Sequence, residues 1–400
     1  MFLKSIQLQN YRNYRRLDLE VEPSINVLYG PNAQGKTNLI EAIYLCACAR
    51  SHRTSKDRDL ILRGNREYKV SLTLLSKRND FLYEENVALS FLEEDGKKAK
   101  RTVFHNQVPF ERISDYLGLF HAVIFAPEDL QLVKEGPSVR RRFMDILISQ
   151  VKPTYFYNIS VYSRLLLQRN KVLKNIRQRE KYHHLSSEDE RELEIWDFPL
   201  AEAGGKIIAD RIFFSNRIRK IAREKHRQIS DDKEELNIRY KTITGILDEK
   251  KEKFPYNYEG EIAEIFLNRL ASSHQDDYEK GNTGCGPHRD DLEIFLNGEN
   301  VKIYASQGQQ RSVALSLKLA ELILLKEETR EMPVLLLDDV FSELDAKRRE
   351  CLLEYIEEAQ IFVTCTDLFF LENIFVRWRE EKGKKIAFFE VLDGAVRRIP

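Results

Sequence analysis

Eight residues near the N-terminus have the composition of a loop that binds phosphate groups. The run GPNAQGKT, residues 30–37, matches GxxxxGKT and lies between a predicted strand and a predicted helix. Its glycines let backbone N–H groups surround phosphate oxygens, and the helix adds the positive end of its dipole. Lys36 would reach the β- and γ-phosphates of ATP, and the Thr37 hydroxyl would bind Mg²⁺ as cofactor. The predicted nucleotide-binding residues here are Gly30, Pro31, Asn32, Ala33, Gln34, Gly35, Lys36, Thr37 and Asn38.

Two carboxylates near the C-terminus could complete this site. The run VLLLDD, residues 334–339, is apolar until it ends in Asp338 and Asp339. A buried parallel strand has this composition, and ligands bind at the carboxyl end of such strands. We expect Asp338 to hold Mg²⁺ together with Thr37, and Asp339 to polarise the attacking water. The predicted catalytic residues are therefore Lys36, Asp338 and Asp339; a plain boundary between strand and turn is the alternative.

A serine-tipped turn opens a long helical pattern about thirty residues earlier. Val313, Leu317, Ala320 and Leu324 form its apolar stripe. A serine cap with a glycine beside it at a helix N-terminus can bind an anion, although the same residues can be a simple helix cap. The first loop already surrounds the β-phosphate, so we interpret this turn as contacting the γ-phosphate in another copy of the chain. Its residues are Ser306, Gln307, Gly308, Gln309 and Gln310.

The remaining pattern predicts an α/β fold, a P-loop NTPase head with an inserted helical arm. Strands are expected at 2–9, 25–30, 69–76, 86–94 and 121–126, and the first helix begins at Thr37. Residues 138–228 read as helices interrupted at Pro153, before a capping box of Ser187 and Glu190, and at Gly204–Gly205. The predicted domains are 1–135 (head, N-terminal part), 136–283 (arm) and 284–400 (head, C-terminal part).

The composition excludes some classes of protein and leaves others open. The 64 basic and 64 acidic residues cancel, so nucleic-acid binding would need local basic patches. Five scattered cysteines without a CxxC pair argue against a disulfide framework and against a zinc site. Neither a signal peptide nor an apolar run long enough to span a membrane is recognisable. We expect a soluble, cytoplasmic protein with no membrane partner.

The order of these motifs resembles that of ABC-type ATPases, in which two subunits enclose two nucleotides. SQGQQ corresponds to the signature motif, VLLLDD to Walker B, and Ser342, Glu343, Leu344 and Asp345 to the D-loop. Over nearly its whole length the chain is similar to the RecF family of bacterial DNA replication and repair proteins, which are SMC-like recombination mediators. The matching stretches are LQNYRNY, NVLYGPNAQGKTNLIEAIYL, RSHRT, FAPEDLQLVKEGPSVRRRFMD, TGCGPHRDDL, SQGQQRSVALSLKLAE and LLLDDVFSELD.

This resemblance implies an SMC-like ATPase head that forms an ATP-dependent homodimer on DNA near the nucleoid. It implies that RecR and RecO are partners, and that the protein helps to load RecA at gaps between single- and double-stranded DNA. Roles in the SOS response and in maintaining replication forks follow from the same family. It also implies that Arg12 and Asn13 lie near the nucleotide, and that residues 127–131 occupy the Q-loop. Asp339 replaces the usual Glu, and the strand IFVTCTD, where a switch His is expected, offers Thr364, Cys365 and Thr366, so we expect slow hydrolysis. The resemblance implies that this weak ATPase activity is stimulated by DNA.

Several basic residues are candidates for contacts with DNA phosphates, although each could also belong to a solvated helix face. They are Arg50, Arg53, Arg140, Arg141, Arg142, Arg217 and Lys220. The motif TGCGPHRDDL has no assigned function, and His288 within it is either part of a rigid polar turn or a catalytic base. Two other functions remain open: an ABC-like ATPase of phage defence, and a P-loop enzyme such as a kinase that does not act on DNA.

Overall fold

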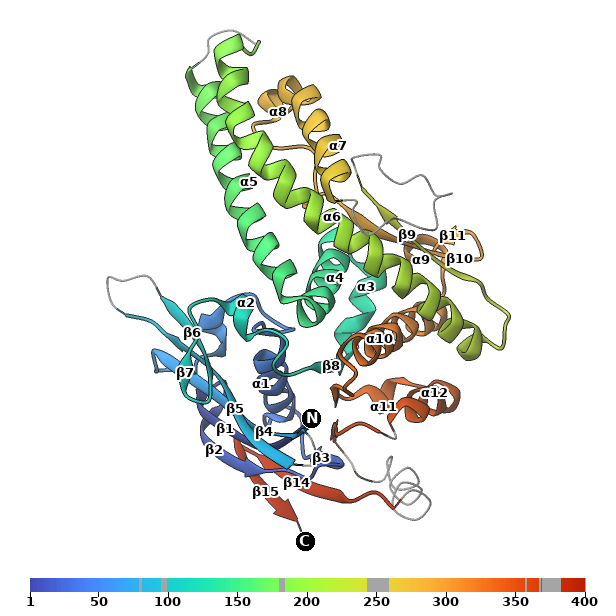
Figure 1. Cartoon of the computed structure of the whole chain (residues 1–400). Helices are drawn as coiled ribbons and strands as arrows, with labels where there is room; N and C mark the ends of the chain where they lie inside the picture. The colour runs from blue at the N-terminus through green and yellow to red at the C-terminus, as the bar shows by residue number, and fades with distance from the viewer. Residues whose placement is uncertain are drawn as a thin grey trace. The chain divides into compact units, whose positions relative to one another are not determined.

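The computed structural model describes residues 1–78, 81–94, 99–179, 184–242, 259–356, 358–366, 368 and 383–399 (Figure 1). The chain forms two compact units. The first contains Met1–Leu130, Lys225–Lys233 and Arg311–Pro400, and the second contains Gln131–Glu224 and Glu234–Gln310. In the part of the chain that the structure describes, no helix is long and apolar enough to cross a membrane.

A mostly parallel sheet forms the core of the first unit. Its strand order is β15-β14-β3-β13-β12-β8, with β15 antiparallel at one edge. All residues of β8, β12 and β13 are buried, as expected for parallel strands covered on both faces. The bounds are β3 (Ile25–Tyr29), β8 (Ala122–Phe125), β12 (Val334–Leu337), β13 (Ile361–Cys365), β14 (Ile386–Leu392) and β15 (Ala395–Ile399).

An antiparallel sheet forms the second layer of this unit. Its order is β2-β1-β4-β5-β6-β7, and its central pair confirms the antiparallel strands predicted at 69–76 and 86–94. Helix α1 (Lys36–Cys48) contacts β8 and β13 of the first sheet and β4 and β5 of the second, so its largely buried surface lies between the two. The bounds are β1 (Phe2–Tyr11), β2 (Tyr14–Glu20), β4 (Glu67–Arg78), β5 (Phe81–Leu92), β6 (Lys100–His105) and β7 (Val108–Pro109).

Short helices connect the strands of the first unit, and the last parts of two long helices, residues 225–230 and 311–329, belong to it. The short elements are η1 (Asp57–Leu60), α2 (Ile113–Tyr116), η2 (Pro127–Leu130), α11 (Val340–Glu343) and α12 (Ala346–Ile356). Helix α10 (Gln307–Thr329) begins in the second unit and continues through the first. Its predicted apolar stripe is confirmed, because Val313, Leu317, Ala320 and Leu324 are all buried.

The second unit is mainly helical. The long helices α5 and α6 lie side by side (Figure 1), and Arg169 on α5 pairs with Asp197 on α6 at 2.6 Å. The elements are α3 (Gln131–Lys134), α4 (Pro137–Val151), α5 (Pro153–Arg179), α6 (Ser187–Ser230), β9 (Leu236–Lys241), α7 (Glu259–Ser272), α8 (His274–Lys280), β10 (Asp291–Leu296), β11 (Glu299–Asn300) and α9 (Val301–Tyr304). Because β10 pairs with β9, this unit extends to Gln310, beyond the predicted end of the arm at 283.

Two local predictions about α6 are wrong. The capping box consists of Ser186 and Asp189, since the Asp189 N–H donates to Ser186 Oγ and the Ser186 N–H donates to Asp189 Oδ2, both at 3.2 Å. The helix also continues through Gly204–Gly205. A Cβ at Gly204 would lie 2.5 Å from the ring of Phe266, so α7 needs a residue without a side chain there. These glycines allow close helix packing and do not end the helix.

Candidate nucleotide site

The predicted phosphate loop lies between β3 and α1, and its glycines have no room for a side chain. Gly30 and Gly35 have φ values of 145° and 119°, which disfavour other residues. A Cβ at Gly30 would lie 2.5 Å from the carbonyl oxygen of Val391, and one at Gly35 would lie 2.7 Å from Nδ2 of Asn13. The loop therefore has the close backbone curvature that a phosphate group requires.

Lys36 is buried within this loop. Its ammonium donates to the carbonyl oxygens of Gly30 and Pro31, the latter at 2.7 Å. Burial lowers the pKa of Lys36, while the nearby carboxylates of Asp339 and Asp338 act in the opposite direction. Because the loop carbonyls carry no formal charge, the arrangement fits a phosphate as the ligand of this ammonium.

Thr37 and Asp338 meet although they are far apart in the sequence. The hydroxyls of Thr37 and Thr364 donate to the same carboxylate oxygen of Asp338, at 3.0 and 2.7 Å. Burial raises the pKa of Asp338, and these two hydrogen bonds lower it. A hydroxyl and a carboxylate are oxygen donors of the kind that Mg²⁺ prefers. The residues present therefore fit Mg²⁺, with Thr37 and Asp338 as the side chains that would hold it.

Thr364 orients both predicted acids, which sequence reasoning missed. It donates to Asp338 and accepts a 2.9 Å hydrogen bond from the N–H of Asp339, which has a left-handed backbone with φ of 52°. The strand register pairs Leu337 with Val363, so Thr364 follows directly beside Asp338. In the sequence, the only indication of this role was the position of Thr364 at the end of a buried strand. The Asp339 side chain is exposed.

Asn13 contacts the phosphate loop, whereas Arg12 is paired elsewhere. Asn13 Nδ2 donates to the Gln34 carbonyl at 2.8 Å, and its Oδ1 accepts from Asn38 at 2.9 Å. Arg12 donates through Nε and Nη2 to the two carboxylate oxygens of Glu41, both at 2.8 Å. Glu41 is fully buried, and a buried carboxylate needs such a partner. Arg12 therefore forms an ion pair with α1, and its expected place near the nucleotide stays a prediction.

The predicted serine cap of α10 is confirmed. The Gln309 N–H donates to Ser306 Oγ at 3.3 Å, and the Ser306 N–H donates to Gln309 Oε1 at 2.8 Å, which together form a capping box. Ser306, Gln307 and Gly308 are exposed, while Gln310 is buried and donates to the Ala305 carbonyl at 3.2 Å. The turn therefore presents the N-terminus of a long helix at the surface of the second unit.

Part of the predicted D-loop can be described. Leu344 is buried, and Asp345 caps α12 by accepting a 2.9 Å hydrogen bond from the Arg348 N–H. The side chains of Ser342 and Glu343 lie outside the described part of the structure. The backbone of both residues belongs to the short helix α11.

Comparison with known proteins identifies the family. The model of the RecF/RecN/SMC N-terminal domain matches residues 2–379. The DNA replication and repair protein RecF of Acetivibrio thermocellus is 43% identical over 373 residues, which cover 93% of this chain and 95% of that protein. The protein of the same name from Halothermothrix orenii is 42% identical over 399 residues, which cover 100% and 99%. The chain belongs to the RecF family.

A solved structure of this family has the same fold. The structure of the recombination mediator protein RecF-ATP in the RecFOR pathway is similar at a TM-score of 0.84 and 36% sequence identity, covering 100% of this chain and 98% of that chain. The resemblance to RecF and the SMC-like ATPase-head fold, both predicted from the sequence, are confirmed.

In this RecF-family chain, the candidate DNA-binding residues differ in exposure. Arg50 and Lys220 are exposed, Arg142 is partly buried, and the guanidinium of Arg217 lies 5.8 Å from the ring centre of Phe213. Arg53 is exposed but donates to Asn38 Oδ1 at 3.0 Å, which connects its loop to the phosphate-loop helix.

Arg140 and Arg141 are bound within the second unit. Arg140 is buried and donates to both carboxylate oxygens of Asp291, at 2.8 and 2.9 Å. Arg141 donates to the Asp290 carbonyl at 2.6 Å. In this structure Arg140 holds α4 to β10 and is engaged within the unit, and a run of arginines in a sequence does not reveal such partners.

The motif TGCGPHRDDL forms a polar junction inside the second unit. The hydroxyl of Tyr162 lies 2.7 Å from His288 Nδ1, and His288 Nε2 lies 3.1 Å from the Thr283 carbonyl. A carbonyl can only accept, so Nε2 carries the proton and Nδ1 accepts from Tyr162. Arg211 donates to the Pro287 carbonyl at 2.6 Å and pairs with Asp145 at 2.8 Å. These contacts show that the motif, including His288, connects α4, α5 and α6.

We expect His288→Gln to reduce the acid sensitivity of this unit. Burial lowers the pKa of His288 from its ordinary value of 6.5 to about 4. The neutral imidazole therefore stabilises the fold above pH 6.5, and this contribution is lost as the pH falls towards 4. Glutamine can donate to Thr283 and accept from Tyr162 but does not titrate. Thermal melting should show that the wild type loses about 1–2 kcal/mol more than the variant between pH 7.5 and pH 5; equal losses would contradict this.

Proposed function

We propose that this chain is an ATP-dependent DNA-binding protein of recombinational repair with weak, DNA-stimulated ATPase activity. It binds ATP and Mg²⁺, dimerises on DNA and acts with RecR and RecO to load RecA at gaps. In this role it serves the SOS response and replication-fork maintenance in the cytoplasm, at the nucleoid. The proposal rests mainly on one observation: in a chain of the RecF family, the Thr37 hydroxyl donates a hydrogen bond to Asp338 beside the phosphate loop.

Each residue of the site has a different function in ATP hydrolysis. The backbone of residues 30–37 and the ammonium of Lys36 bind and orient the phosphates. Thr37 and Asp338 would hold Mg²⁺, which would supply positive charge to the phosphate oxygens. Asp339 accepts a proton from the attacking water or orients it, since its carboxylate is exposed at the end of β12. Thr364 fixes the position of both acids.

A second copy of the chain supplies the signature turn. The exposed N-terminus of α10 offers the positive end of its helix dipole to the γ-phosphate of the neighbour's nucleotide. Ile303 and Tyr304, just before Ser306, are 70% and 68% exposed, although apolar side chains of this size are usually covered. A dimer formed by this surface would cover them. ATP would therefore join two subunits head to tail.

Contacts with DNA would be made through phosphates. Arg50, Arg53 and Lys220 are the exposed members of the predicted set, and arginine and lysine bind phosphates without regard to base sequence. Binding should therefore weaken steeply as salt increases. The choice of gapped DNA would come from its shape and from the partner proteins.

The decisive experiment measures association and ATP hydrolysis together. Light scattering should show a monomer without nucleotide and a dimer with ATP, Mg²⁺ and DNA. Steady-state hydrolysis per subunit should rise with protein concentration and increase again when gapped DNA is added. Hydrolysis that is independent of protein concentration and of DNA would contradict the proposal and favour a P-loop enzyme that does not act on DNA.

We expect Thr364→Val to slow hydrolysis while ATP still binds. Valine has a similar shape but cannot donate to Asp338 or accept from Asp339. Loss of such a supporting contact typically costs about 10–100-fold in activity. Single-turnover hydrolysis and ATP titration should show a fall in rate with the dissociation constant nearly unchanged. Thr364→Ser, which keeps the hydroxyl, is the control and should retain most of the activity; equal rates in both variants would refute this role.

A further inference from the structure

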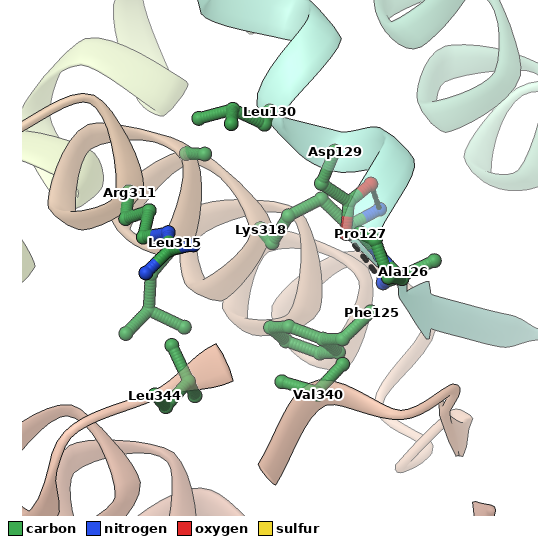
Figure 2. Close-up of a pocket in the computed structure, with 11 residues that line it drawn as sticks. Phe125, Ala126, Pro127, Asp129, Leu130, Arg311, Leu315, Lys318, Val340 and Leu344 are labelled. Atoms are coloured by element: carbon green, nitrogen blue, oxygen red, sulfur yellow. Dashed lines mark hydrogen bonds and ion pairs between the residues drawn. The ribbon is translucent and has the colours of Figure 1, made fainter. Parts of the chain in front are cut away.

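A buried ammonium connects the end of β8 to helix α10 (Figure 2). Lys318 on α10 is 4% exposed, and it forms ion pairs with Glu321 of the same helix and with Asp129 of η2. Its Nζ lies 3.9 Å from Asp129 Oδ1. Burial works to lower the pKa of Lys318, but the charges of Glu321 and Asp129 outweigh it and raise the pKa. The ammonium therefore stays charged, and its pair with Asp129 links two separate elements.

Asp129 also shapes the turn that follows β8. Its Oδ2 accepts a 2.9 Å hydrogen bond from the Ala126 N–H, and its own N–H donates to the Ala126 carbonyl at 3.0 Å. Burial raises the pKa of Asp129 to about 6, so the carboxylate remains largely ionised at neutral pH. One carboxylate thus closes the turn of residues 126–129 and attaches it to α10.

This turn lies beside the predicted magnesium site. Strand β8 is the parallel neighbour of β12, with Phe125 paired to Leu337, and the Asp338 N–H donates to the Phe125 carbonyl at 2.8 Å. Glu128, within the turn, is exposed. The turn therefore carries a further carboxylate directly after the strand end that is bonded to Asp338.

Side-chain packing leaves space next to this link. A cavity of about 60 Å³ separates part of α10 from the β8 turn and from α11 (Figure 2). Its apolar walls include Phe125, Pro127, Leu130, Leu315, Val340 and Leu344. Walls that face a gap lose dispersion contacts with one another. The ion pair between Lys318 and Asp129 connects the turn to the helix beside this space.

We propose that Lys318 is a positioning residue for ATP hydrolysis: through Asp129 it holds against α10 the β8 turn, which carries Glu128 and follows the strand end bonded to Asp338. This inference rests on the proposed ATPase function. It assigns Glu128 as the side chain of residues 127–131 that takes the place of the Q-loop glutamine. Because α10 begins directly after Ser306, a shift of that helix when the signature turn binds would reach Glu128 through the same link.

Two matched variants test the link. Asp129→Asn keeps an acceptor for the Ala126 N–H but removes the charge that pairs with Lys318. Glu321→Gln removes the same charge from the other partner of Lys318 and leaves the connection to the turn intact. Both leave one carboxylate for one ammonium, so both should fold. Replacing Lys318 itself would leave two buried carboxylates without a cation, which is strongly destabilising.

The first readout needs no nucleotide. Amide hydrogen exchange of the segment 126–131 should be at least about fivefold faster in Asp129→Asn and within about twofold of wild type in Glu321→Gln, because a turn released from α10 opens more often. The second readout is single-turnover hydrolysis. It should fall about 10–100-fold in Asp129→Asn with unchanged ATP affinity, and stay near wild type in Glu321→Gln.

Equal effects of the two substitutions on exchange and hydrolysis, or no effect of Asp129→Asn on exchange, would overturn the inference. A merely structural role would lower the melting temperature of both variants and change their activity in parallel. If the wild type hydrolysed no ATP, the proposed function would be wrong, while the exchange experiment would still decide whether the link exists.

Discussion

Lys36→Met should abolish ATP-dependent dimerisation. The ammonium of Lys36 is buried in the phosphate loop and bound to uncharged carbonyl oxygens, so methionine removes the main positive charge that the loop offers to the nucleotide. Loss of a preorganised charged donor of this kind typically costs about 10²–10³-fold in rate. Light scattering with ATP and Mg²⁺ should show a monomer, and hydrolysis should fall to background.

The control for this variant is its thermal stability in the absence of nucleotide. Methionine fills a similar volume, so the melting temperature without nucleotide should stay close to that of the wild type. A Lys36→Met protein that still dimerises with ATP would count decisively against the nucleotide site described here.

Ser306→Arg should block dimerisation and hydrolysis while the monomer still binds ATP. Ser306 is exposed at the start of α10, so arginine can be accommodated in the monomer at the cost of the helix cap, about 1 kcal/mol. In the proposed dimer the long side chain would occupy the place of the neighbour's γ-phosphate. ATP titration of the monomer should give a nearly unchanged dissociation constant, while scattering shows no dimer.

Ser306→Thr is the matched control, because threonine keeps the hydroxyl and caps helices nearly as well. It should dimerise and hydrolyse ATP close to the wild-type level. If Ser306→Arg lost ATP affinity to the same extent as it lost dimerisation, the turn would serve the nucleotide of its own chain.

Sequence reasoning succeeded where a motif fixes backbone geometry locally. The phosphate loop between β3 and α1 and the serine cap of α10 follow from residue types at fixed spacing. The meeting of Thr37 with Asp338 was also predictable, because both lie at the carboxyl ends of strands in one parallel sheet.

Predictions failed where a partner far along the chain decides the outcome. Nothing in the sequence indicated that Arg12 pairs with the buried carboxylate of Glu41. Arg140 was expected at the surface, but Asp291 neutralises it. Gly204 was interpreted as a helix end, whereas its missing side chain admits Phe266. In each case the pairing depends on tertiary structure, which local periodicity and charge do not reveal.

The central claim, a nucleotide enclosed between one chain's phosphate loop and another chain's signature turn, is tested most directly by mixing two inactive variants. In a head-to-tail dimer of Lys36→Met with Ser306→Arg, one site combines the intact loop of the second variant with the intact turn of the first. The equimolar mixture should therefore recover ATP hydrolysis, up to about half of the wild-type rate, because neither variant dimerises alone and each mixed dimer has one intact site of two. A mixture no more active than the two variants measured separately would contradict the claim.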